Sequence, residues 1–240
     1  MPRPLREWKV LPHGKLSVVD DNLLSVVGEL PMPIGDFPRR MTVARLQDDR
    51  LVIFSAIALD EDEMRALEEF GQPAFLVVPS DRHRMDAKIW KDRYPAMVVL
   101  TPPGARKKVE EVVPVDATSL DFGDPTVQLV AVPGTEEHEA ALVVQSAGGT
   151  TLIVNELIWN VDHRPGFGGW LMKVTGMTSD KPQIPAIPKL LGFKDQPALR
   201  RQLEAWAGLD NLRRIIVSHG HIIESRPDQV LRGLAQELAA

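Results

Sequence analysis

The sequence contains no cysteine among its 240 residues, so disulfide bonds and thiolate metal ligands are both excluded. It also lacks a strong excess of charge, since 28 Lys and Arg residues stand against 33 Asp and Glu residues. Binding to a nucleic-acid backbone needs clustered positive charge, and the densest basic run is only Arg106 to Lys108. We therefore expect no nucleic-acid partner, and any metal must be held by His and carboxylate side chains.

Long apolar runs are missing as well. No stretch approaches the roughly 20 apolar residues that a bilayer crossing needs, and Met1 to Pro4 lacks the apolar core of a signal peptide. We therefore expect a cytoplasmic protein with no membrane partner. With 44% hydrophobic and 25% charged residues, the chain can build a substantial core, and we predict one domain over residues 1–240.

The first half of the chain changes from pairs of strands to strands that alternate with helices. Apolar residues at Met64, Leu67 and Phe70 share one helical face, and Gly71 ends that pattern. The expected elements are strand pairs at 16–27 and 41–57, a helix at 60–71, a strand at 75–78, a helix at 85–93 and a strand at 97–100. This order is typical of a layered α/β fold.

The second half opens with three strands and ends with two helices around a final strand. The expected elements are strands at 128–132, 141–145 and 151–154, a helix at 197–206, a strand at 212–217 and a helix at 227–238. Gly and Pro residues interrupt the segment at about 160–190, which we interpret as an excursion that covers or lines the site. Its aromatic residues Trp159, Phe167 and Trp170 either form an apolar lid or pack the excursion onto the body.

Side chains that bind metals follow three of the apolar strands. The strand at 75–78 is followed by Asp81 and His83, the strand at 151–154 by Glu156, and the strand at 212–217 by His219 and His221. A tight Pro-Gly turn after the strand at 128–132 leads to His138. Short apolar runs are typical of strands buried on both faces, and their ends meet at one rim of a sheet. We therefore expect chemistry at that rim.

The order of these strand ends resembles the metallo-β-lactamase fold, a four-layer αββα sandwich with a metal site at one edge of two facing sheets. The resemblance covers residues 16–223, and it is closest to an uncharacterised branch with degenerate ligand motifs. The family motif H-x-H-x-D-H falls on residues 81–86, which keep only its second histidine, His83. Glu156 stands where the family has a bridging aspartate, and His219 stands where it has its last histidine ligand.

The resemblance implies an α/β fold and a metal-dependent hydrolase. In this interpretation His83, Glu156 and His219 hold one divalent ion, which is zinc, iron or manganese because only N and O ligands are present. Catalytic zinc lowers the pKa of its water to about 7, which suits attack on an ester, amide, thioester or phosphoester of a small molecule. Further ligands or partners that orient the first three would be Asp81, Asp86, His138 and His221.

A second hypothesis is a binding or structural relative that has lost the metal, and the broken motif favours it. His83, His219 and His221 would then bond backbone groups or face solvent, Asp86 would serve the start of a helix, and His138 would belong to an acidic turn. Glu156 fits this alternative less well, because a buried carboxylate needs a partner. Exposed strand edges in such sandwiches can pair, which leaves a homo-oligomer open.

Overall fold

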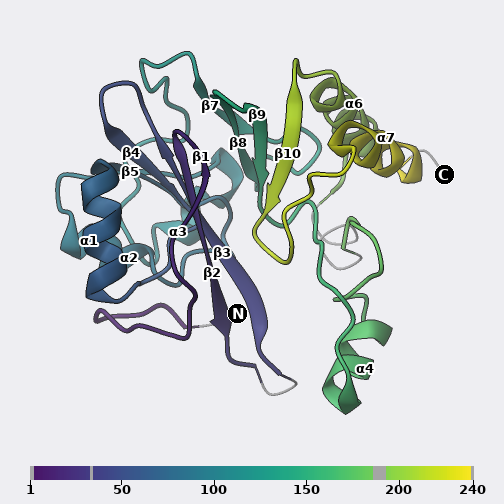
Figure 1. Ribbon diagram of the computed structural model, residues 1–240, viewed down its shortest axis with the longest axis horizontal. Helices are drawn as coiled ribbons and strands as arrows, with labels where there is room; N and C mark the ends of the chain where they lie inside the picture. The colour runs from purple at the N-terminus through teal and green to yellow at the C-terminus, as the bar shows by residue number, and fades with distance from the viewer. Residues whose placement is uncertain (1–2, 33–34, 186–192, 239–240) are drawn as a thin grey trace.

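The computed structural model describes residues 3–32, 35–185 and 193–238, whose strands form two sheets (Figure 1). The first sheet runs in chain order through β1 (Ser17–Asp20), β2 (Leu23–Leu30), β3 (Phe37–Arg45), β4 (Arg50–Phe54), β5 (Gln72–Val77) and β6 (Val98–Leu100). The second has the order β10 (Leu212–Val217), β9 (Gly149–Val154), β8 (Ala140–Ser146) and β7 (Val127–Ala131). Every strand expected from the sequence is confirmed, with ends that differ by a few residues.

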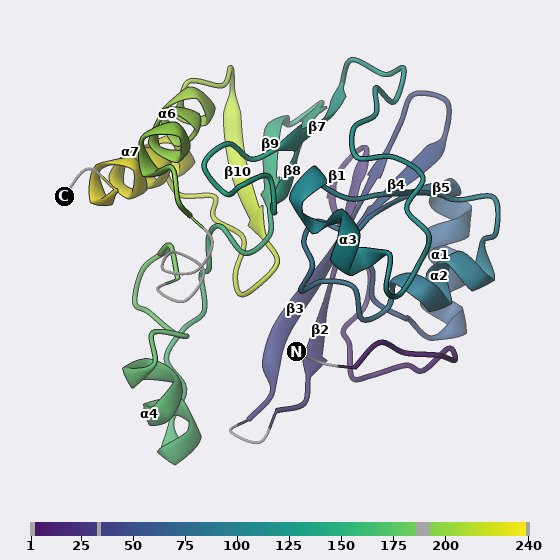
Figure 2. The same ribbon diagram turned by 180° about the vertical axis from the view of Figure 1, so that it is seen from behind.

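Helices cover the outer faces of both sheets. The helical segments are α1 (Glu61–Phe70), α2 (Ala87–Arg93), the 3-10 turn η1 (Pro103–Ala105), α3 (Arg106–Val109), α4 (Gly166–Val174), α6 (Gln196–Ala207) and α7 (Pro227–Glu237). Figures 1 and 2 show α1 and α2 on the outer side of the first sheet and α6 and α7 on the outer side of the second. The order of layers is therefore helix, sheet, sheet, helix.

The alternation of side chains along each strand explains why the sheets are covered on both faces. Leu152 and Val154 of β9 belong to a core shared with Leu203 of α6, whereas Ile153 between them belongs to the core between the sheets. Successive side chains of a strand point to opposite faces, so a continuous apolar run fills both cores. The outer face of the first sheet packs in the same way against Trp90 of α2.

Helix α1 shows how local signals fix an element's ends. Asp60 precedes the helix, and its carboxylate accepts a hydrogen bond of 3.0 Å from the backbone N–H of Glu63, a typical N-cap. Met64 and Leu67 are buried on the face that the sequence predicts. Gly71 ends the helix, and a Cβ atom there would lie 2.4 Å from the carbonyl oxygen of Asp49, so a larger residue does not fit.

Parallel pairing brings the carboxyl ends of several strands to one edge. Strands β4, β5 and β6 are parallel to one another, and β9 is parallel to β10.

Between the sheets, buried Arg40 of β3 donates hydrogen bonds to the carbonyl oxygens of Val217 and Gly220, at 3.1 and 2.7 Å. The same side chain donates to Ser25 Oγ at 2.9 Å. Arg40 therefore connects the first sheet to the loop that follows β10.

The Gly- and Pro-rich excursion differs from its prediction. It contains a helix, α4, which extends away from both sheets (Figures 1 and 2), and Phe167 and Trp170 on it are 77% and 56% exposed. Their rings stack on each other at 5.7 Å, so they neither line the site nor pack onto the body. Residues 186–190 of the predicted excursion lie outside the described residues. In the described part of the chain, no helix combines the length and apolar character needed to cross a membrane.

Candidate metal site

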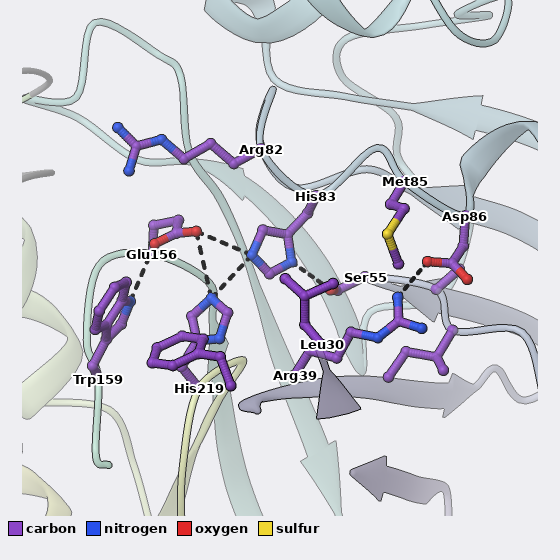
Figure 3. Close-up of a pocket in the computed structure, with 13 residues that line it drawn as sticks. Leu30, Arg39, Ser55, Arg82, His83, Met85, Asp86, Glu156, Trp159 and His219 are labelled. Carbon is purple, nitrogen blue, oxygen red and sulfur yellow. Dashed lines mark hydrogen bonds and ion pairs between the residues drawn. The ribbon is translucent and has the colours of Figure 1, made fainter. Parts of the chain in front are cut away.

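Three strand ends bring His83, Glu156 and His219 together (Figure 3). His83 Nε2 lies 3.1 Å from Glu156 Oε1 and 3.2 Å from His219 Nε2. His219 Nε2 lies 3.4 Å from the same Glu156 oxygen. The three side chains are at most 10% exposed. Among the described residues, this is the one group of His and acidic side chains that could hold a metal ion.

The placement of the three residues follows from the ends of the parallel strands. His83 lies in the loop between β5 and α2, Glu156 comes two residues after β9, and His219 comes two residues after β10. Ser55 follows β4 with a positive φ of 58°, a conformation that is uncommon for a residue with a side chain. Such backbone strain is concentrated at functional sites.

In each cluster side chain, the nitrogen or oxygen that faces away from the centre of the cluster already has a hydrogen-bond partner. His219 Nδ1 donates to the carbonyl oxygen of Pro38 at 2.7 Å, so its Nε2 carries the lone pair when the ring is neutral. His83 Nδ1 and the hydroxyl of Ser55 form a hydrogen bond of 2.7 Å. Trp159 Nε1 donates to Glu156 Oε2 at 3.1 Å. The remaining atoms, two Nε2 and one Oε1, all face the centre of the cluster.

A second layer of buried polar groups fixes the backbone of Glu156. Glu139 Oε2 accepts a hydrogen bond of 3.2 Å from the N–H of Glu156 and another of 3.2 Å from Asn155 Nδ2. Asn155 Nδ2 also donates to Ser80 Oγ at 2.9 Å, which connects the strand end to the loop that carries His83. Burial and the nearby charge of Glu156 hold the pKa of Glu139 well above its usual value.

Burial and neighbouring charges shift the pKa values of two cluster residues, Glu156 and His83. Burial alone would raise the pKa of Glu156, but His219 and His83 outweigh it and hold that pKa well below the usual value. Burial lowers the pKa of His83, although the neighbouring Glu156 acts in the opposite direction. The cluster therefore favours an ionised carboxylate beside a neutral His83 imidazole, the protonation states that a metal ion requires.

The loop that carries His219 is held by close backbone contacts. Gly220 has a φ of 101°, and a Cβ atom on it would lie 1.8 Å from the carbonyl oxygen of Asn160. Asn160 N–H donates to the carbonyl of His219 at 3.0 Å, and His221 N–H donates to the carbonyl of Asn160 at 2.8 Å. Only glycine combines this conformation with this close approach.

The three residues fit a zinc-like ion in spacing and chemistry. Ligand atoms about 2.0–2.1 Å from a tetrahedral zinc lie roughly 3.3–3.4 Å apart, close to the observed 3.1 to 3.4 Å. Two imidazoles and one carboxylate also form the three-ligand set of several catalytic zinc sites. The hydrogen bonds from outer atoms to Pro38, Ser55 and Trp159 are the kind that orient metal ligands.

The other residues predicted for this site lie outside the cluster. Asp81 and His138 are partly exposed, and no hydrogen bond joins their side chains to the cluster among the described residues. His221 is exposed and pairs with Asp162 at 3.1 Å. Asp86 forms a buried ion pair with Arg39, so it is more than a carboxylate at a helix start.

A cavity of about 190 Å³ opens beside the cluster. Its walls are largely apolar, and they include Phe37 and Trp159, whose rings pack 4.9 and 5.1 Å from the His219 ring. Ser55 and the Arg39–Asp86 pair line it as well. Figure 3 shows Ser55 between the cluster and this ion pair. An apolar cavity with a few convergent polar groups is the usual form of a small-molecule site.

Sequence reasoning missed several residues that support the cluster. Ser55 follows the apolar run of β4 directly, so the strand-end argument used for Glu156 and His219 would also have found it. Glu139 precedes β8 and was not considered for the site. Trp159 was named as part of an apolar lid or as packing, and it lies against the cluster. The role of Pro38 depends on its carbonyl oxygen, which no side-chain pattern reveals.

Comparisons with known proteins address the fold. No protein-family model and no curated protein matches the sequence. The solved structure of DIM-1 metallo-β-lactamase matches with a TM-score of 0.66 at 11% identity, over 97% of this chain and 100% of that one. FIM-1 from Pseudomonas aeruginosa, in a mono-zinc form, matches with a TM-score of 0.64 at 13% identity, over 95% and 97%.

A third match is a metallo-β-lactamase from Erythrobacter litoralis with β-mercaptoethanol in its active site. Its TM-score is 0.64 at 14% identity, over 92% of this chain and 96% of that one. Such low identities leave the activity open, but agreement over nearly the full length of each chain defines the architecture. This chain has the metallo-β-lactamase fold, with two sheets between outer helices.

Proposed function

We propose that this chain is a metal-dependent hydrolase that holds one divalent cation on His83, Glu156 and His219. The observation that carries the proposal is a set of three atoms, one from each side chain, that face the centre of the cluster and lie 3.1 to 3.4 Å apart. The other nitrogen or oxygen of each side chain already has a hydrogen-bond partner. A similar structure, FIM-1, is described as a metallo-β-lactamase in a mono-zinc form, which supports a site for one ion. Zinc, iron and manganese all suit N and O ligands.

The residues of this chain would perform distinct tasks in such a reaction. His83, Glu156 and His219 would hold the ion, and the chemistry it would supply is a lowered pKa of water and polarisation of a carbonyl or phosphoryl oxygen of the substrate. His83 and His219 would supply nitrogen donors to the ion, and Glu156 would supply a negative charge. Ser55 and Trp159 keep their partners in place, and the apolar cavity wall excludes bulk water from a small-molecule substrate.

The test is elemental analysis of protein purified without added metal or chelator. We expect about one equivalent of zinc, iron or manganese in the native protein, and none in the double variant Glu156→Ala, His219→Ala. The matched control is His221→Ala, which removes an exposed histidine two residues from His219 and should keep the metal. Circular dichroism must show that all three proteins are folded.

The two function hypotheses give different results. Bound metal that is absent from the double variant would justify a screen of ester and phosphoester substrates. No metal in the native protein, even after reconstitution, would contradict the hydrolase proposal. A relative without metal would then remain, in which the cluster is a buried hydrogen-bonded group and the cavity binds its ligand without hydrolysis.

A further inference from the structure

A buried ion pair lies in the same cavity as the cluster. Arg39 of β3 donates through Nη1 to Asp86 Oδ2, and Asp86 Oδ1 accepts a hydrogen bond of 3.0 Å from the backbone N–H of Ala58. The two side chains are 9% and 2% exposed. Both oxygens of Asp86 are therefore bonded, and Arg39 is bonded through only one of its nitrogens.

The other edge of the Arg39 guanidinium has no partner. Within the described residues, Nε and Nη2 are buried without a hydrogen-bond acceptor. These nitrogens present parallel N–H groups on one side of the planar guanidinium, the geometry that binds a carboxylate through two bonds. Buried donors nearly always have a partner, so an unsatisfied pair points to an acceptor from outside the chain.

The surroundings of this edge favour a small molecule with one negative charge. Leu30, Ile57 and Met85 contribute apolar wall to the cavity, so an anion would be poorly solvated there unless a cation pairs with it. Asp86 bonds Arg39 only through Nη1, so the Nε–Nη2 edge can pair with one further carboxylate, whereas a dianion would bring a second charge that no cation faces. The cavity of about 190 Å³ is small compared with the roughly 300–1,000 Å³ of typical ligand pockets.

We propose that Nε and Nη2 of Arg39 bind a carboxylate of the substrate while its reacting group lies at the cluster. The position of the reacting group rests on the proposed function, whereas the carboxylate site does not. In Figure 3 the cluster and the Arg39–Asp86 pair lie on opposite sides of Ser55. One short molecule could therefore reach the cluster with one end and Arg39 with the other. The site therefore selects small carboxylic acids that carry a hydrolysable bond.

Access to this edge requires a small movement of the wall. Nε and Nη2 are shielded from solvent, so a carboxylate must displace a neighbouring side chain to reach them. Met85 lines the cavity, and its unbranched side chain with three rotatable bonds adapts more easily than a branched one. Binding and a change in the Met85 methyl environment should therefore occur together.

The experiment follows the arginine Nε–H signals by nitrogen-15 NMR in protein treated with chelator, which prevents a carboxylate from binding a metal. One signal should be absent in Arg39→Lys, which retains a cation beside Asp86 but lacks the fork. In the native protein this signal should shift and saturate with propionate, and it should not respond to propionamide. Arg39→Lys should bind propionate at least about tenfold more weakly, measured by the Met85 methyl shift.

The double variant Glu156→Ala, His219→Ala separates this proposal from the proposed function. The propionate shift should persist there, even if the native protein proves to hold no metal. The carboxylate site would be overturned if propionate leaves the Arg39 signal unchanged, or if propionamide shifts it equally. Saturation by inorganic phosphate at lower concentrations than propionate would also overturn it. If Arg39→Lys does not fold, triple-resonance assignment of the native protein identifies the Arg39 signal instead, and its response to propionate and propionamide still decides.

Discussion

The end of strand β10 carries two histidines that each face a carboxylate in very different surroundings. His219 Nε2 lies 3.4 Å from Glu156, and the two side chains are 8% and 7% exposed. His221 Nε2 lies 3.1 Å from Asp162, with exposures of 71% and 73%. The shorter pair is the exposed one, so distance alone does not identify a candidate site. Burial and a third donor, His83, distinguish the first pair from the second.

The backbone between the two histidines produces this difference. Gly220 has a positive φ, and it turns the chain so that His219 enters the site while His221 faces solvent. Exposed ion pairs gain little because water and salt screen them. Buried pairs lose solvation, so each member depends strongly on its partners. Variants at these positions should therefore differ widely in effect.

The largest effect is expected for Gly220→Ala. A Cβ atom would lie 1.8 Å from the Asn160 carbonyl oxygen, in a backbone region that disfavours side chains. We expect a loss of at least about 2 kcal/mol in the free energy of unfolding, together with weaker metal binding. Urea unfolding measures the first effect and chelator competition the second.

The matched control for this variant is Gly233→Ala in helix α7, where nothing lies within 4 Å of the added Cβ. Alanine has the higher helix propensity, so that change should stabilise the protein by up to about 1 kcal/mol. Equal stability of the two variants would show that the contact between Gly220 and Asn160 does not determine the loop.

An intermediate effect is expected for Trp159→Phe. The change removes the hydrogen bond to Glu156 Oε2 but keeps a ring beside His219. Loss of a group that orients a metal ligand should weaken metal binding about tenfold, measured by competition with a coloured chelator. Trp8→Phe is the control, because it removes a similar hydrogen bond of 3.0 Å to the Leu59 carbonyl away from the site. Equal affinities would assign Trp159 a packing role only.

The smallest effect is expected for Asp162→Asn. The variant breaks the exposed pair with His221, and neither the unfolding midpoint nor the metal content should change beyond experimental error. Glu156→Gln breaks the corresponding buried pairs, and it should lose the metal. A loss of metal in Asp162→Asn would contradict the distinction between the two pairs.

Sequence patterns predict the framework well where one periodicity dominates. Strand β10 has the predicted bounds, 212–217, and α1 lies within the predicted helix at 60–71. Helix α4 was missed because three glycines in nine residues obscure helical periodicity. Of the aromatic residues for which a lid and packing onto the body were both left open, Phe167 and Trp170 point into solvent and do neither, whereas Trp159 lines the cavity.

The candidate site is predictable only in part for a physical reason. His83, Glu156 and His219 follow apolar strands directly, so the strand direction determines where they meet. Arg39 is different, because it lies inside β3 and its partner Asp86 is 47 residues away. Nothing in the alternation of β3 indicates that this arginine has a buried and unsatisfied edge. Whether the three cluster residues bind metal stays a prediction.

Arg40 has a consequence for folding. Its buried side chain bonds to the carbonyl oxygens of Val217 and Gly220, and burial lowers its pKa to about 10. The guanidinium of Arg40 can therefore exchange its hydrating water for these carbonyl oxygens only when β10, more than 170 residues later in the chain, packs against the first sheet. The N-terminal sheet on its own would expose this cation and the apolar surface around it. We therefore expect the two sheets to unfold together, as one unit, because separating them would leave Arg40 without these partners.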